Sequence, residues 1–400
     1  IKLCTAIRTH LINDLLSPVQ TTVSNSDSVG SSDPLPSLDR RTNDGTSYSG
    51  SKRKLSKVMR VIHSKRAKVG GNQVLSNMSN MLDYLGEDIE QSINDSTPTM
   101  RAGIRKALSG LSSVFQGDLN REPATGMKPM EIHMNEGTVW EQHLNSQPPR
   151  VQSLLKSQEI VKQIDKMLAS GIIRASSATS YSQVMLTPKS DGSWRFCIDY
   201  RRLNAVTKPN RFPLPRIKQM LNRLGDKRPK FFGVIDLTKG YYQAPLAEAC
   251  KFLTAFITPN GLYEWNRVAM GLAGSPGYFQ QAMAQEILRD YLYARCELYL
   301  DDIIVFGRTE EEFLENLRLV LIRLSEHNIT INPRKCKLGL TSVEYVGHTI
   351  SQEGVHFSRE KLQKVIDMPR PVTAKHLKSF VGLANYFRDH IMNHSARIEP

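Results

Sequence analysis

Cysteine is scarce in this 400-residue chain. The five cysteines are scattered, and no two stand in a CxxC pair; they are Cys4, Cys197, Cys250, Cys296 and Cys336. Zinc sites and disulfide frameworks need closely or regularly spaced thiols, so neither is implied. A reducing compartment fits this cysteine usage best.

Long apolar runs are also missing. No stretch of about 18 apolar residues occurs, so the sequence predicts no transmembrane helix. Residues 1–16 lack the continuous apolar core of a signal peptide. We therefore expect no membrane partner and an intracellular location, in a cytoplasmic particle or the nucleus. Because residue 1 is isoleucine, we also expect the chain to be a fragment of a longer polyprotein or an open reading frame read without its start.

Acidic side chains are outnumbered. The chain has 39 acidic and 53 basic residues, a formal net charge of +14 and a pI near 9.5. Such an excess predicts a polyanionic partner, of which nucleic acid is the commonest, although solubility alone is an alternative. The apolar fraction of 40% is ordinary for a chain of two or three globular domains.

The N-terminal region is poor in large apolar side chains. Residues 17–50 are mostly small and polar, so we expect them to be disordered. Residues 52–68 are basic without acids and could bind nucleic acid, serve as a nuclear localisation signal or be a solvated tail. We therefore assign 1–120 to a mostly disordered, low-complexity basic region and 121–150 to a linker. No Asp-Thr-Gly or Asp-Ser-Gly triplet occurs, so no protease activity is assigned.

The stretch CELYLDDIIVFG, residues 296–307, predicts a tight hairpin with two carboxylates at its tip. Two short apolar runs flank Asp301 and Asp302. Adjacent carboxylates among apolar residues cost desolvation and repulsion unless a cation neutralises them. On the hairpin alone, an ordinary solvent-facing turn is an equal alternative.

A third carboxylate, Asp236, ends the apolar run Phe231–Ile235. We expect this segment to share one sheet with the hairpin. Three carboxylates there could hold two divalent ions, one to activate an attacking hydroxyl and one to stabilise a leaving pyrophosphate.

These residues resemble a known signature. Tyr299 to Asp302 is similar to the tyrosine, variable residue and two aspartates of reverse transcriptases, and Asp236 stands where that family keeps its other catalytic aspartate. From Gln147 onward the chain resembles the polymerase of gypsy-type long-terminal-repeat retrotransposons. The matching stretches are DGSWRFCIDYRRLNAVT (191–207), RFPLPRI (211–217), MGLAGSPGYFQ (270–280), EYVGHTI (344–350) and LKSFVGLANYFRDH (377–390).

The resemblance implies an α+β right-hand polymerase. Its palm would contain an antiparallel sheet, with fingers and a partial thumb, behind the largely disordered N-terminal region. Fingers and palm would occupy 151–307, the rest of the palm and the primer grip 308–357, and the start of thumb and connection 358–400. The chain would end before an RNase H domain.

The activity implied is that of an RNA-directed DNA polymerase, a nucleotidyltransferase. Asp236, Asp301 and Asp302 would be catalytic and would hold two Mg²⁺ ions, with Mn²⁺ as a substitute. The partners would be an RNA and DNA template-primer and deoxynucleoside triphosphates, with RNase H and integrase domains outside this chain. The rival interpretations are a decayed retroelement fragment that only binds nucleic acid and a basic coat protein.

The resemblance also implies a nucleotide pocket. Lys189 and Arg195, on a hairpin of strands 181–187 and 194–200, could close over the triphosphate. Tyr241 would pack against the deoxyribose and exclude a 2′-hydroxyl, although it could instead be a core tyrosine. Met270 and Gly271 would line the pocket; many relatives carry phenylalanine or glutamine where Met270 stands.

The primer grip would be the hairpin of residues 344–357, turning at Glu353-Gly354. Tyr345, Gly347 and His348 would then lie near the primer terminus. His348 is not expected to bind metal, because no histidine or cysteine partner has ligand spacing.

Apolar periodicity predicts the remaining elements. We expect helices over 154–168, 213–224, 278–291, 310–327, 359–367 and 374–390, a weak helix over 74–91, and a hairpin of strands 252–257 and 262–265.

Overall fold

A computed structural model describes residues 88–140, 147–189, 192–357, 363, 367–369, 371–386 and 388. The disordered region expected at 17–50, the basic run 52–68, most of the helices expected over 74–91 and 359–367, and the tip of the hairpin at 190–191 lie outside these residues. In the described part no helix is long and apolar enough to cross a membrane.

A four-stranded antiparallel sheet, here called the central sheet, carries the predicted hairpin. Its strand order is β11-β6-β10-β9, and its strands are β6 (Phe231–Asp236), β9 (Cys296–Tyr299), β10 (Asp302–Gly307) and β11 (Lys337–Leu340). Asp302 pairs with both Tyr299 and Asp236. The prediction that Asp236 and the hairpin share one sheet is therefore confirmed.

The side chains of β10 alternate between two hydrophobic clusters. Ile303 and Val305 join the larger cluster on one face, whereas Ile304 and Phe306 join a smaller cluster on the other. This two-residue period is that of a strand with both faces covered. Both faces of the sheet are therefore packed.

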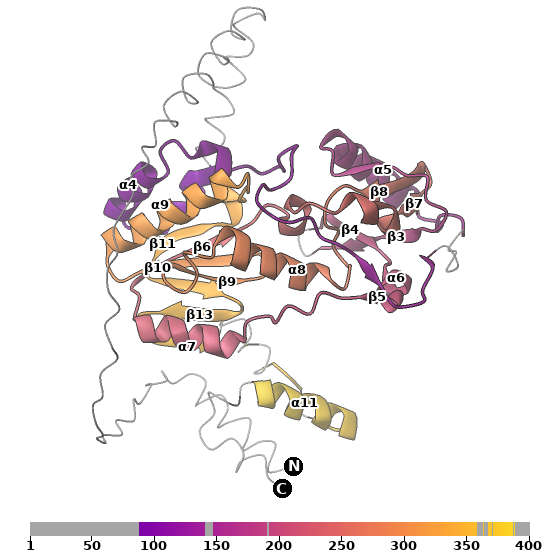
Figure 1. The fold of residues 1–400 in the computed structure, drawn as a ribbon. Helices are drawn as coiled ribbons and strands as arrows, with labels where there is room; N and C mark the ends of the chain where they lie inside the picture. Colours follow the sequence, from indigo (N-terminus) through magenta and orange to yellow (C-terminus); the bar gives the residue numbers. More distant parts are fainter. Residues whose placement is uncertain are drawn as a thin grey trace, which may run out of the picture. The chain divides into compact units, whose positions relative to one another are not determined.

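Helix α9 (Glu310–Glu326) packs on the first face (Figure 1). Its first turn is capped by Thr309, whose side chain accepts a hydrogen bond from the Glu312 amide, and it carries three glutamates that suit a helix N-terminus. The apolar residues on the buried side of the helix are Phe313, Leu317, Val320, Leu321 and Leu324.

The second face is covered by α7 (Ile217–Lys227) and by the three-stranded sheet of β12 (Ser342–Tyr345), β13 (His348–Ser351) and β14 (Gly354–Phe357). The helix begins four residues later than predicted, because Pro213 and Pro215 hold the preceding segment in an extended form. The turn predicted at Glu353-Gly354 lies one residue earlier, at Gln352-Glu353, because Gly354 already pairs with Ser351 as the first residue of β14, and a second turn joins β12 to β13.

A second large sheet has five strands in the order β2-β8-β7-β3-β4. Its strands are β2 (Ile173–Ala175), β3 (Ser182–Pro188), β4 (Trp194–Ile198), β7 (Phe256–Thr258) and β8 (Gly261–Trp265). The expected strand over 252–257 is shorter, since Glu248–Thr254 forms a 3₁₀ helix. Helix α5 (Leu154–Ala169) buries Ile160, Ile164 and Met167 but leaves Leu154 and Leu155 exposed.

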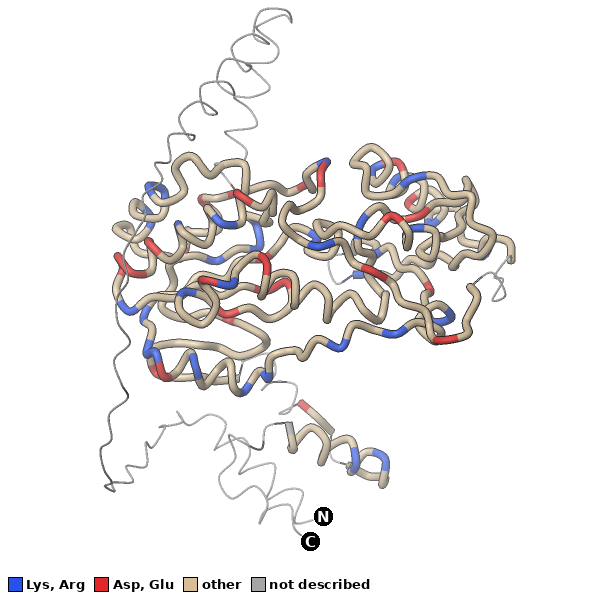
Figure 2. Tube along the Cα trace, in the orientation of Figure 1, with Lys and Arg blue, Asp and Glu red and all other residues tan. Residues whose placement is uncertain are grey.

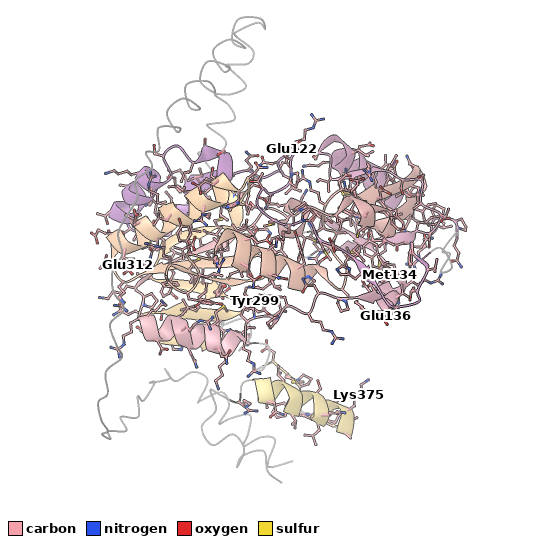
Figure 3. The ribbon with its side chains drawn as sticks, in the orientation of Figure 1. Glu122, Met134, Glu136, Tyr299, Glu312 and Lys375 are labelled. Carbon is pink, nitrogen blue, oxygen red and sulfur yellow. The ribbon has the colours of Figure 1, made fainter. Side chains whose placement is uncertain are left out.

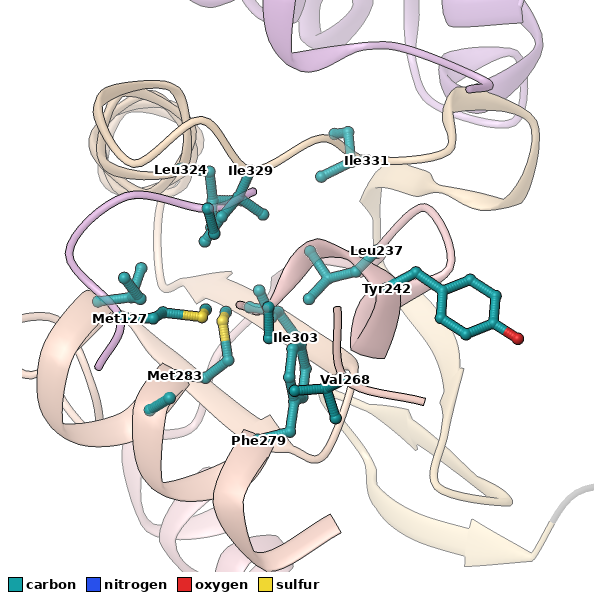
Figure 4. Close-up of a cluster of buried hydrophobic side chains, with 14 of the residues drawn as sticks. Met127, Leu237, Tyr242, Val268, Phe279, Met283, Ile303, Leu324, Ile329 and Ile331 are labelled. Carbon is teal, nitrogen blue, oxygen red and sulfur yellow. The ribbon is translucent and has the colours of Figure 1, made fainter. Parts of the chain in front are cut away.

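Residues 88–140 are part of the folded unit. Helix α4 (Pro98–Ala107) packs on α9 and β11, and the turn Ser112–Val114 and strand β1 (His133–Met134) follow. The described part of the region expected to be disordered, and most of the expected linker, are thus ordered. Met127 lies in the core beside Leu324 and Ile329 (Figure 4).

The remaining elements are short. Helix α6 (Arg201–Val206) leads into β5 (Thr207–Lys208), which pairs with β1. Helix α8 (Ser275–Ala282) continues as a π-helical turn, Met283–Ile287, so the long helix expected over 278–291 starts earlier and ends earlier. A 3₁₀ turn covers Pro333–Lys335, and α11 (Ala374–Tyr386) confirms part of the last predicted helix.

Candidate active site

The hairpin turn presents Leu300 and Asp301 between β9 and β10. Tyr299, labelled in Figure 3, is the last residue of β9 and faces Asp302 across the hairpin. Leu300 has φ +58°, a left-handed conformation that is costly for a residue with a branched side chain. A two-residue turn of this kind favours glycine at its first position. Contacts with the rest of the protein must therefore stabilise Leu300 in the left-handed conformation.

The carboxylates of the site repel one another. Burial, followed by the nearby charges of Asp301 and Asp236, raises the pKa of Asp302 to about 6. Burial also raises the pKa of Asp236, while Lys335 opposes that shift. A group of partly buried like charges is therefore built into this end of the central sheet.

Lys335 is the cation nearest to this group. Its Nζ lies 3.4 Å and 3.3 Å from the two carboxylate oxygens of Asp236. The residue ends the 3₁₀ turn that precedes β11, and the amide of Asn332, at the start of that turn, donates to the Asp236 carbonyl at 2.9 Å. Lys335 cannot be recognised from the sequence, because nothing in the run Pro333-Arg334-Lys335 distinguishes it from other surface cations.

The donor set suits a hard divalent cation. Mg²⁺ prefers carboxylate oxygens, and a bound cation would offset the burial and the repulsion that together raise the Asp302 pKa. Within the described ranges, no three His, Cys, Asp or Glu side chains are already grouped closely enough to hold an ion. The residues fit the metal by chemistry and by shared position at the sheet end.

Tyr241 and Gly240 line the space beside Asp301. A Cβ at Gly240 would lie 3.1 Å from the Asp301 Cβ and 3.4 Å from the ring of Phe279, so the backbone passes very close to both. The half-buried Tyr241 ring packs on Phe279 with centroids 5.1 Å apart. Burial, with a contribution from Asp301, raises the Tyr241 pKa to about 12.

Tyr242 faces elsewhere. It is buried and stacks on Trp265, with ring centroids 4.7 Å apart. Tyr241 and Tyr242 are neighbours in one 3₁₀ turn, Gly240–Gln243. The two rings still diverge.

The other nucleotide candidates lie on separate elements. Lys189 follows β3, and its charge helps burial and Lys166 to lower the pKa of Lys239, three residues after Asp236. Arg195 is exposed on β4, opposite Thr187. Two more candidates lie between β8 and α8: Met270 is exposed, and Gly271 has φ +94°.

The primer-grip candidates are more buried than expected. Tyr345 is 2% exposed, and its hydroxyl donates to the Asp302 carbonyl at 3.2 Å. His348 is also buried, while Gly347 forms the β12–β13 turn with φ +74°. Both side chains are therefore largely withdrawn from solvent.

Comparison with known proteins identifies the domain. Residues 187–350 match the family described as reverse transcriptase (RNA-dependent DNA polymerase). The chain carries a reverse transcriptase domain. The reverse transcriptase resemblance drawn from Asp236, Asp301 and Asp302 is thereby confirmed at the level of the family.

Its relatives include retrotransposon polyproteins. The chain is 36% identical over 247 residues to the retrovirus-related Pol polyprotein from transposon opus of Drosophila melanogaster, covering 60% of this chain and 24% of that protein. It is 33% identical over 244 residues to the corresponding polyprotein from transposon gypsy (60% and 23%), and 32% identical over 245 residues to the Tf2-3 polyprotein of Schizosaccharomyces pombe (61% and 18%). The chain thus spans a quarter or less of the length of these relatives.

Solved structures confirm the fold. A foamy viral protease-reverse transcriptase in complex with double-stranded DNA aligns with TM-score 0.65 and 24% identity, covering 79% of this chain and 54% of that one. A complex of the foamy viral enzyme with an RNA/DNA hybrid aligns with TM-score 0.62 and 23% identity, covering 77% and 40%. The predicted reverse transcriptase fold with antiparallel sheets is therefore correct.

Proposed function

We propose that this chain is the polymerase portion of a retrotransposon polyprotein and catalyses RNA-directed DNA synthesis. The observation that carries the proposal is the pairing of Asp236 with Asp302, beside Asp301, at one end of the central sheet of a reverse transcriptase domain. In this proposal the central sheet belongs to the palm, and the hairpin of β3 and β4 belongs to the fingers.

Each part of the site has a role in nucleotide addition. Asp236, Asp301 and Asp302 would hold two Mg²⁺ ions, which when bound supply charge neutralisation and activation of the primer hydroxyl. Tyr241, supported by Phe279, would lie against the sugar. Gly240 keeps the space beside Asp301 free of a side chain.

The nucleic-acid partner is supported by the distribution of charge. Residues 205–225 contain no Asp or Glu, and Lys and Arg recur along α7 and the extended segment before it (Figure 2). Arg211, Arg216 and Lys218 are exposed there. Sequence-independent contacts of such cations with phosphates would position a template-primer over the site.

Primer extension tests the proposal. Asp236→Asn and Asp301→Asn should each lower the single-turnover rate on an RNA template by about 10³-fold or more, because each removes a charge needed where charge develops in the transition state. Binding of primer-template should stay within a few-fold of the parent.

Asp226→Asn is the matched control, since Asp226 is exposed on α7. It should extend primers at the parental rate. Equal extension by the parent and the Asp236 or Asp301 variants would refute the catalytic assignment. If the parent binds template-primer but does not extend it with Mg²⁺ or Mn²⁺, the chain is a nucleic-acid-binding remnant.

A further inference from the structure

Gln280, on α8, makes two hydrogen bonds to the backbone of the catalytic hairpin. Its Oε1 accepts from the Leu300 amide at 2.7 Å, and its Nε2 donates to the Leu298 carbonyl at 3.5 Å. The side chain is 2% exposed, so water does not compete readily for either partner. Gln280 therefore contacts the backbone on two of the three residues that precede Asp301.

The turn that Gln280 contacts needs support. Leu300 adopts φ +58° in the two-residue turn Leu300-Asp301. The conformation of this turn sets the positions of Asp301 and of Asp302, which follows it. A buried amide without an acceptor is costly. The conformation in which the Leu300 N–H donates to Gln280 is therefore lower in free energy than one in which this bond is broken. The hydrogen bond thus favours the strained conformation over a relaxed one.

The neighbouring residue on α8 contacts a different part of the site. Phe279 packs on Tyr241, which the proposed function places against the nucleotide sugar. Two successive residues of one helix thus touch the aromatic side of the site and the carboxylate turn. The helix is a common support for both.

We propose that Gln280 is a positioning residue for the catalytic turn: it holds Leu300 in the left-handed conformation and thereby places Asp301 and Asp302. This inference rests on the proposed polymerase function. It assigns Gln280 no contact with substrate or metal.

Backbone hydrogen exchange tests the hydrogen bond without reference to activity. In the unmodified protein the Leu300 amide, although it lies in a turn, should exchange about as slowly as the Ile303 amide in β10. In Gln280→Met, which keeps the length of the side chain but cannot accept this bond, Leu300 should lose protection while Ile303 keeps it. Rapid exchange of Leu300 in the unmodified protein overturns the proposal, even if the variant fails to fold.

Two further measurements separate positioning from general stability. Gln280→Met should weaken Mn²⁺ binding, followed by electron paramagnetic resonance, and the single-turnover rate by about 10- to 100-fold each, as found for residues that orient metal ligands. The dissociation constant for nucleotide should change by less than about threefold, because the lost interaction is not with substrate.

Gln285→Met is the control. Gln285 is exposed on the same helical segment and accepts a hydrogen bond from Gln281, so its loss removes a polar contact of the same kind away from the turn. It should leave exchange, Mn²⁺ affinity and rate unchanged. A parental rate and Mn²⁺ affinity in Gln280→Met would contradict the inference. If no variant or parent extends primers but exchange and Mn²⁺ binding respond as expected, the proposed function fails and the positioning role stands.

Discussion

Tyr241 is the residue whose surroundings most directly predict substrate choice. Its ring lies on Phe279 beside the turn that carries Asp301, and it is only half-buried, so part of the side chain remains accessible. Tyr241→Ala should raise the use of ribonucleotides relative to deoxyribonucleotides by about 10- to 100-fold, because removing the ring opens space for a 2′-hydroxyl. The ratio of the two kcat/KM values is the measurement.

Tyr241→Phe is the matched comparison for this prediction. It keeps the ring and its packing on Phe279 and removes only the hydroxyl, so the parental ratio should be retained. An unchanged ratio in a folded alanine variant would place sugar discrimination at another residue.

Asp199, at the end of β4, predicts a pH dependence. Its carboxylate accepts two hydrogen bonds of 2.7 Å from Arg201 and one of 3.0 Å from Arg150. These bonds, and those from Arg201 most of all, hold the pKa of Asp199 well below the ordinary 3.8. A lowered pKa in the folded state means that the ionised group stabilises the fold above pH 3.8, and that this stabilisation declines as the pH falls below that value.

Asp199→Asn should therefore lower the free energy of unfolding by about 1–2 kcal/mol at pH 7, a modest figure because Arg201 is largely exposed. The difference from the parent should be constant down to about pH 4 and shrink below it. Urea midpoints across this range provide the measurement. A difference that is independent of pH down to pH 3 would show that the ion pairs do not cause it.

Two glycines predict opposite effects at the scale of elements. A Cβ at Gly307, the last residue of β10, would collide with the backbone of Phe313 in α9. Gly225, inside α7, has nothing within 4 Å of the corresponding position. Gly307→Ala should destabilise the protein by about 2 kcal/mol or more by forcing α9 away from the sheet, whereas Gly225→Ala should stabilise it by about 0.5–1 kcal/mol.

Thermal or urea unfolding of the two variants measures the contrast. Both substitutions add one methyl group. Opposite changes in the free energy of unfolding would therefore have to come from the surroundings of the two glycines. A neutral Gly307→Ala would mean that β10 and α9 separate without cost, contrary to the close contact between them.

Elements with a dense local pattern were predictable from sequence. The hairpin of β9 and β10 combines apolar alternation with a polar turn, and α9 combines a cap at Thr309 with a long apolar stripe, so both could be located closely. Helix α4 could not, because its apolar residues are few and become a core only against β11 and α9. The first residue of α7 depends on how many residues around Pro213 and Pro215 stay extended. The spacing of apolar residues alone does not predict that number.

The candidate site was predictable in its carboxylates and not in its supports. Asp236, Asp301 and Asp302 stand in recognisable local contexts. Gln280 is the last residue of the stretch MGLAGSPGYFQ, but its contact with Leu300 joins residues 20 positions apart in sequence. No local sequence pattern predicts such a contact. Lys335 is 99 residues from Asp236. These pairings arise only when the sheet is assembled.

At the scale of the whole molecule, the burial of α4 predicts the effect of truncation. Met100 and Ile104 of α4 are fully buried. Deleting residues 1–111 should therefore cost about 3 kcal/mol or more of stability, since large core side chains are lost. Deleting residues 1–87 should leave the single-turnover rate on saturating template-primer unchanged. Unfolding and extension assays on the two truncated proteins make the comparison.

The basic run 52–68 adds an electrostatic prediction for the shorter deletion. Log affinity for duplex should fall linearly with log salt, with a slope of about 0.9 per phosphate neutralised. Removing 1–87 should flatten this slope and weaken binding. Filter binding across a salt series measures it, and an unchanged slope would leave the run without a role in nucleic-acid binding.

The segment that follows α4 has a consequence for biosynthesis. Phe115 forms a bridge with Ile331, and the Asn120 side chain bonds to Asn328, 208 residues later in the chain. At about 5–20 residues per second, a ribosome needs roughly 10–40 s to supply those partners. Throughout that interval Phe115 lacks its bridge partner Ile331, so the nascent chain should be more prone to capture by chaperones or to aggregation before residue 331 emerges than after it.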